Sequence, residues 1–218
     1  MAKGVLIAAF DFSQAPPDEF NDWYDLEHIP ERERVPGFLA CERWLGAANP
    51  KQSVATYDLA SLEVLGSAPY RAIAYENLSV WSKRVTAMCK RLLRFEGEQI
   101  VPGDLAAPKD AAALLLVAMN VVPEHERDFN EWYDKEHVPA LAAVPGTLAA
   151  RRYRARAGSH RYAALYHLAS PEVPDSAAWK KAVDTPWTAK LRPHFRDQLR
   201  IVSRRYVRAK LPGAPIGG

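Results

Sequence analysis

The chain of 218 residues has little cysteine: only Cys41 and Cys89 are present, at unrelated positions. Two such cysteines do not form a disulfide framework, so no disulfide is expected. The sequence also has no apolar run near the roughly 20 residues that a membrane-spanning helix needs. Its first ten residues lack the long apolar region of a signal peptide. These absences predict a cytoplasmic protein that does not associate with a membrane.

Several motifs for cofactors and catalysis are also missing. The sequence contains no glycine-rich phosphate loop and no dinucleotide fingerprint. It has no serine elbow, and neither a His-Glu-x-x-His motif nor paired cysteines at zinc spacing. The six histidines do not cluster in the sequence. We therefore expect no cofactor and no metal, with a haem held by distant histidines as the alternative.

The chain does contain one long repeat. Residues 19–30 read EFNDWYDLEHIP, and residues 128–139 read DFNEWYDKEHVP. Each copy is followed by Val-Pro-Gly, at 35–37 and at 144–146, so the offset is 109 residues throughout. A match of this length across mixed residue types indicates a tandem duplication.

The duplication suggests how the chain divides into domains. With 48% hydrophobic and 25% charged residues, the composition is that of a globular protein. We expect a first repeat at 1–102, a linker at 103–112 and a second repeat at 113–210. Residues 211–218, rich in proline and glycine, are expected to form a disordered tail.

The two halves differ in charge. Residues 1–108 carry 11 Lys and Arg against 15 Asp and Glu, a net charge of −4, whereas residues 109–218 carry 18 against 11, a net charge of +7. One interpretation is that the two repeats are electrostatically complementary where they pack. The alternative is an anionic partner on the arginine-rich second half.

Periodicity and turn residues predict the same order of elements in both halves, βαββαβ. In the first helix, Pro30 is expected to end the helix because proline disfavours helical geometry at the residue before it. The expected strands are 4–12, 38–45, 53–59, 91–101, 113–121, 147–156, 160–168 and 198–208, and the expected helices are 16–29, 67–88, 123–140 and 176–191.

This order predicts an α+β fold of two ferredoxin-like repeats, each a four-stranded antiparallel sheet with both helices on one face. The bare faces of the two sheets can cover each other, so we expect sheet-to-sheet packing as an intrachain α+β barrel with a cavity between the sheets. RNA-recognition modules share the element order. The central strands lack their aromatic motif, so no nucleic acid partner is expected.

The two Phe-x-x-Trp-Tyr-x-x-x-His-(Ile/Val)-Pro segments, each followed by Val-Pro-Gly, resemble the EthD-like branch of the dimeric α+β barrel superfamily. The resemblance covers both repeats, whereas members normally pair two single-repeat chains. It implies a cofactor-free lyase, isomerase or cyclase that acts on a small aromatic, polyketide or lactone-like substrate, or a haem protein. Further association into a homodimer is compatible with it.

His28 and His137 are the main catalytic candidates. Each lies in the last helical turn before an Ile/Val-Pro step, where the helix C-terminus favours the charged imidazole and shielding favours the neutral one. Such a histidine suits general acid–base catalysis, and the resemblance implies an active-site role. The alternative is structural, a ring that hydrogen-bonds the last helix carbonyls.

Tyr24 and Tyr133 lie one turn before these histidines and are candidate proton donors, or core residues with an anchored hydroxyl. Glu27 and Glu136 precede the histidines and are expected either to orient them or to lie on a solvated face.

Strand residues complete the candidate site. Arg43 and Arg152 match between the copies and would bind a carboxylate or enolate oxygen if they face the cavity. Trp44 and the matching pair Tyr57 and Tyr166 are candidate substrate-binding residues. The sequence therefore predicts a cofactor-independent lyase or isomerase, with a non-catalytic ligand-binding barrel as the alternative.

Overall fold

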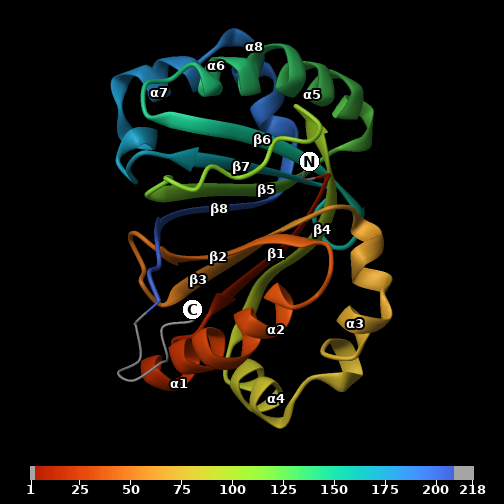
Figure 1. Ribbon diagram of the computed structural model, residues 1–218. Coiled ribbons are helices and arrows are strands. Elements are labelled where there is room, and N and C mark those ends of the chain that lie inside the picture. Colours follow the sequence, from red (N-terminus) through yellow and green to blue (C-terminus); the bar gives the residue numbers. More distant parts are fainter. Residues whose placement is uncertain (1–2, 209–218) are drawn as a thin grey trace.

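The computed structural model describes residues 3–208, so the expected tail at 211–218 lies outside the described residues. Eight strands form one closed antiparallel barrel in the order β1-β3-β2-β8-β5-β7-β6-β4. The helices cover two opposite sides of this barrel, α1–α4 over the strands of the first half and α5–α8 over those of the second (Figure 1). No helix within the described range has the length and apolarity to cross a membrane.

The elements follow the expected order closely. The strands are β1 (Gly4–Asp11), β2 (Phe38–Gly46), β3 (Gln52–Leu59), β4 (Lys90–Val101), β5 (Ala113–Val121), β6 (Thr147–Ala157), β7 (Tyr162–Leu168) and β8 (Phe195–Arg205). The α-helices are α1 (Pro17–Asp22), α2 (Ile29–Glu33), α3 (Ala68–Arg71), α4 (Val80–Ala87), α5 (Glu126–Trp132), α6 (Val138–Ala142), α7 (Ala177–Val183) and α8 (Pro186–Leu191).

The barrel closes at two junctions between the halves. Strand β2 pairs with β8, where Trp44 lies opposite Arg205, and β4 pairs with β6, where Gly97 lies opposite Ala155. At each junction the second strand of one half meets the last strand of the other. The predicted α+β barrel within one chain is confirmed.

Alternating residues of β1 show what lies inside the barrel. Val5 and Ile7 pack in the interior with Leu114, whereas Leu6 and Phe10 point outward to the helices. Side chains therefore fill the space between the two sheets. The expected cavity between the sheets is wrong, because the open space lies outside the barrel, between the sheet and its helices.

The expected helix end at Pro30 is also wrong. A π-helical segment, η1 (Trp23–His28), connects α1 to α2, and the helix continues to Glu33. The Ile29 N–H donates to the Tyr24 carbonyl, five residues back. This wider turn accommodates a proline, which has no N–H to donate. The second half repeats it in η5 (Tyr133–His137), before Pro139.

A charged cluster lies inside the barrel where the halves meet. Arg151 Nη1 donates to both carboxylate oxygens of Asp58, at 2.9 and 2.7 Å, and both side chains are almost completely buried. His167 Nε2 lies 3.5 Å from Arg151 Nη2 and 4.0 Å from Glu42 Oε2, and Glu42 Oε1 pairs with Arg205 at 2.7 Å. The acids come from the first half and the bases from the second. This arrangement supports the predicted complementarity of the halves.

The connection between the halves is fixed to the same cluster. Gln99 exchanges two hydrogen bonds of 2.9 Å with the backbone of Leu105, and the Ala107 N–H donates to Asp58. The Leu105 carbonyl also accepts from Arg151 at 3.3 Å. The expected linker is therefore held against the barrel.

Candidate functional site

The first half contains a cavity of about 230 Å³ between the outer face of the sheet and the helices. We call it the N-terminal pocket. Its strand residues are Leu6, Ala8, Phe10, Tyr57, Arg91 and Arg94, and its helix and loop residues are Trp23, His28, Arg32, Tyr70, Ala74, Tyr75, Leu78 and Thr86.

His28 contributes an imidazole to this pocket from the end of the π-helical segment. The ring packs 4.4 Å from Trp23 and edge-on to Tyr24 at 5.2 Å, measured between centroids. Burial, and next the charge of Arg32, hold the pKa of His28 well below its usual 6.5. The imidazole is therefore neutral at physiological pH.

The hydrogen bonding of His28 separates the two roles predicted for it. Its Nδ1 atom is buried and has no hydrogen-bond partner within residues 3–208, and the same is true of His137 Nδ1. The structural alternative requires a ring nitrogen that binds the helix carbonyls. Neither histidine makes such a bond in the described part of the chain.

Tyrosine hydroxyls are the other polar groups near this ring. Tyr57 is 1% exposed and lines the pocket, and its hydroxyl has no partner among the described residues. Burial raises the pKa of Tyr57 well above 10, so the group is a neutral donor. Tyr24 is fully buried behind the lining, and burial raises its pKa to about 12. The structure therefore brings Tyr57 to the pocket rather than Tyr24.

Two arginines give the N-terminal pocket a positive potential. Arg32 is 3% exposed, pairs with Glu31 at 2.5 Å and donates to the Ile73 carbonyl at 3.1 Å. Arg94 pairs with Glu96 at 2.5 Å. Arg32 and Arg94 are both among the charges that lower the pKa of His28. The same field favours a negative charge on a bound molecule.

A hydrogen-bond chain holds the ring that packs against His28. Trp23 Nε1 donates to Ser82 Oγ at 2.9 Å, and Ser82 donates to Glu27 at 3.1 Å. Ser79, the N-cap of α4, donates to the same carboxylate at 2.6 Å. Glu27 therefore fixes α4 over the pocket, and does not contact the imidazole by hydrogen bond.

The second half contains an equivalent cavity of about 220 Å³, which we call the C-terminal pocket. Its lining includes Tyr133, His137 and Tyr166, and burial followed by the charge of Arg152 lowers the pKa of His137 to about 3. The other lining residues are Leu115, Val117, Met119, Trp132, Leu141, Trp179, Val183, Thr188, Arg192, Phe195, Gln198 and Arg200.

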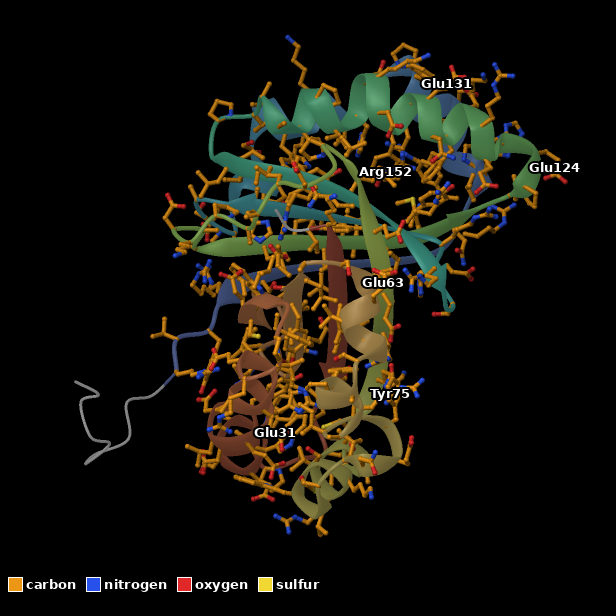
Figure 2. All side chains as sticks on the ribbon, turned by 45° about the vertical axis from the view of Figure 1, so that its right-hand side comes forward. Glu31, Glu63, Tyr75, Glu124, Glu131 and Arg152 are labelled. Carbon is orange, nitrogen blue, oxygen red and sulfur yellow. The ribbon has the colours of Figure 1, made fainter. Side chains whose placement is uncertain are left out.

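The two pockets differ in the length of the chain that leads to the helix cap beside each of them. The chain between Ala74 and the helix cap Ser79 is three residues longer than the equivalent chain between Val183 and the cap Thr185. The additional residues form a short 3-10 turn that starts at Tyr75, which lies among the helices of the first half (Figure 2). Tyr75 has φ 57°, a conformation that costs a non-glycine residue about 1–3 kcal/mol and clusters at functional sites. This turn lines the N-terminal pocket alone.

Arg43 and Arg152 do not line either pocket. Arg43 donates to Asn21 at 2.9 Å and to Asp25 at 3.3 Å, and its guanidinium stacks 4.1 Å from the Tyr24 ring. Arg152, seen between the helices and strands of the second half in Figure 2, makes equivalent contacts at 2.6 Å to two helix side chains. Both guanidiniums therefore link the sheet to the helices through these hydrogen bonds.

Trp44 is likewise separate from the pockets. It is fully buried in the barrel interior, where its Nε1 donates to Thr56 at 3.2 Å. Since neighbouring strand residues face opposite sides, Trp44 points inward and Arg43 outward.

The buried histidines predict a pH dependence of stability. Burial lowers the pKa of His28, His137 and His167 in the folded chain, whereas an unfolded histidine titrates near 6.5. Below that pH the unfolded state binds more protons, so stability falls. We expect the free energy of unfolding to decrease below about pH 6.5, by up to about 1.4 kcal/mol per pH unit for each histidine.

Urea unfolding at a series of pH values measures this slope. The double variant His28→Gln/His137→Gln is expected to lose a large part of it. An equal slope in the variant and the parent chain would show that these rings titrate normally.

No protein-family model matches the chain, and no curated protein matches it by sequence. Solved structures do resemble it. An anthrone oxidase-like protein has 13% identity and a TM-score of 0.63, covering 94% of this chain and 92% of its own. A heme-binding protein from Thermus thermophilus has 13% identity and a TM-score of 0.58, covering 95% and 92%. A mutant of chlorite dismutase from Candidatus Nitrospira defluvii has 11% identity and a TM-score of 0.58, covering 94% and 92%.

These similarities extend over nearly the whole chain at low identity, and they agree with the barrel order and the helices on its two outer sides. The chain therefore shares the fold of these structures, with a closed eight-stranded antiparallel barrel formed by one polypeptide.

Proposed function

We propose that the N-terminal pocket is the active site of a cofactor-independent lyase or isomerase. Its substrate would be a small aromatic or lactone-like molecule that carries a carbonyl group. The observation that carries this proposal is the neutral imidazole of His28 in an apolar cavity, beside the buried hydroxyl of Tyr57, which has no hydrogen-bond partner among the residues described. An apolar cavity with a few convergent polar groups is the usual form of such a site.

His28 is the base in this reaction. A ring nitrogen accepts a proton from the substrate carbon next to the carbonyl group, and the electron pair of that C–H bond moves to the carbonyl oxygen. An imidazolium beside Arg32 is unfavourable in the empty pocket, as the low pKa of His28 indicates. The enolate formed in the same step supplies the compensating negative charge.

Tyr57 and the nearby arginines stabilise the enolate. The Tyr57 hydroxyl donates to the developing oxyanion, and no acceptor among residues 3–208 competes for this hydrogen bond. Arg32 and Arg94 contribute the positive field. His28 then returns its proton to a different carbon, which gives an isomer. Alternatively, the enolate re-forms the carbonyl and a carbon–carbon double bond as the bond from the β-carbon to the leaving group breaks; the leaving group takes the proton from His28, which gives the product of a lyase.

The chain is, in this proposal, a fusion of two EthD-like, ferredoxin-like repeats, 1–102 and 113–210, joined by 103–112. The repeated motif and its two π-helical segments support this origin. His137 and Tyr166 hold the positions equivalent to His28 and Tyr57 in the C-terminal pocket, which Tyr133, the counterpart of Tyr24, also lines. They remain candidates for the same chemistry there.

A haem, as in the Thermus thermophilus protein, does not fit these residues. A histidine that binds a metal nearly always donates its other ring nitrogen to an acceptor, and the buried Nδ1 atoms of His28 and His137 have none in the described part of the chain. Within residues 3–208 no cluster of three or more His, Cys, Asp and Glu side chains could hold a metal ion.

Deuterium exchange tests the proposal without knowledge of the natural substrate. The probe is 2-tetralone, an apolar aromatic ketone with acidic protons next to its carbonyl group. We expect the protein to accelerate the incorporation of solvent deuterium at these carbons, as measured by proton NMR. If 2-tetralone binds and exchanges only at the buffer rate, the barrel binds ligands without catalysis.

A further inference from the structure

The C-terminal pocket differs from the N-terminal pocket in whether its strand arginine has an ion-pair partner. In the strand registers, Ala8 lies opposite Arg94 and its counterpart Val117 lies opposite Arg200, so the two arginines are equivalent. Arg94 donates to Glu96 at 2.5 Å and to the Tyr70 hydroxyl at 3.4 Å.

Neither partner of Arg94 has a counterpart in the second half. Glu96 lies opposite Leu6 on β1, and Val202 lies opposite Leu115, the counterpart of Leu6, on β5. Val202 therefore takes the place of Glu96. Trp179 replaces Tyr70 in the lining. Arg200 is exposed, lines the pocket and has no ion pair within residues 3–208.

A second arginine lies at the same rim. Arg192 occupies the position that Thr86 has in the first half, because each lies seven residues after the equivalent helix cap, Thr185 or Ser79. It is exposed and lines the C-terminal pocket, and among the described residues it forms no ion pair. It also borders an adjoining depression that contains Lys180 and Lys181, with Asp184 as the one acid of that lining. The rim is therefore cationic, and Arg192 and Arg200 have no carboxylate partner in the described range that would compete with a bound anion.

The interior of the C-terminal pocket is more apolar than its counterpart. Leu141 takes the place of the buried Arg32, and Leu115, Val117 and Met119 line the strand side. An apolar cavity of about 150 Å³ holds benzene, so the 220 Å³ here accommodates a body of one or two rings.

We propose that the C-terminal pocket binds an aromatic carboxylate. The ring system occupies the apolar interior, and the carboxylate lies at the rim between Arg192 and Arg200, where guanidiniums form charge-assisted hydrogen bonds. This site is separate from the N-terminal pocket and does not require proton transfer at His28.

Calorimetric titration with 2-naphthoate tests the proposal, and the uncharged 2-naphthamide is the matched ligand. We expect 2-naphthoate to bind with a dissociation constant below about 1 mM, roughly tenfold more tightly than the amide, and more weakly as salt is added. The double variant Arg192→Thr/Arg200→Ser should weaken naphthoate binding at least tenfold and leave amide binding unchanged. The control Arg91→Ser, at the other pocket, should retain the affinity of the parent chain for naphthoate.

Methyl NMR of carbon-13-labelled methionine locates the ligand. Met119 lines the C-terminal pocket, whereas Met88 packs against the core of the first half. We expect naphthoate to shift the Met119 signal and not that of Met88. Equal affinity for naphthoate and naphthamide, full affinity in the double variant, or a shift confined to Met88 would each overturn the proposal.

Discussion

Replacing His28 by glutamine should lower the rate of deuterium exchange into 2-tetralone by about 100- to 10,000-fold, the usual contribution of a positioned general base. Glutamine preserves polarity and approximate size but accepts no proton at neutral pH. Exchange is measured by proton NMR in heavy water, with the buffer rate subtracted.

The control is His160→Gln, which removes a histidine on the β6–β7 connection, outside the linings of the N-terminal and C-terminal pockets. It should exchange at the rate of the parent chain. Circular dichroism and unfolding by urea establish that the His28 variant is folded. A folded His28→Gln protein with full exchange activity would remove His28 from the mechanism.

Replacing Asp58 by asparagine should lower the free energy of unfolding by about 3–5 kcal/mol, because it leaves a buried arginine without its counter-ion. The Arg151 side chain is completely buried, and both oxygens of Asp58 accept from it. Desolvated charges cannot recover their hydration within the folded barrel. Urea unfolding followed by tryptophan fluorescence measures the loss.

Two further variants separate this effect from a general sensitivity to lost charge. The double replacement Asp58→Leu/Arg151→Leu should recover most of the stability, since buried pairs exchange for apolar residues at little cost. Glu172→Gln, which breaks an exposed pair with Arg204, should change stability by about 1 kcal/mol or less. A loss below that size for Asp58→Asn would contradict the role given to the interior pair.

The charged cluster also explains why the barrel pairs two different halves and not two identical ones. Glu42 and Arg151 occupy equivalent positions, as do Asp58 and His167. A barrel made from two first halves would place the Glu42 carboxylate where Arg151 now pairs with Asp58, and one made from two second halves would leave Arg151 without the Asp58 carboxylate. The barrel with one half of each kind avoids both the repulsion between two carboxylates and the unpaired buried arginine.

Much of this fold is visible in the sequence. The 109-residue repeat and the alternation of strand and helix signals predict the element order and the intrachain barrel. The continuation of the helix beyond Pro30 is not visible, because it depends on a π-helical hydrogen bond to the Tyr24 carbonyl. The position of the cavity is not visible in the sequence either, because the sequence does not reveal that apolar side chains and the charged cluster fill the barrel.

The candidate site is predictable only in part. The repeat singles out His28 and Tyr57, and the structure brings both to one pocket. The face on which Arg43 lies depends on strand register, which the sequence leaves open. Arg32 and Arg94 were not singled out, because charged residues on a helix and on a last strand resemble ordinary surface residues.

Nitrogen-15 NMR of the histidine rings tests whether His28 is a neutral base that meets ligands in the N-terminal pocket. We expect the His28 ring to keep the nitrogen shifts of a neutral imidazole well below about pH 6.5, the pH at which a free histidine titrates. We also expect the addition of 2-tetralone to change those shifts. A His28 ring that becomes protonated near pH 6.5 and does not respond to 2-tetralone would show that His28 is not the base of a ligand-binding pocket.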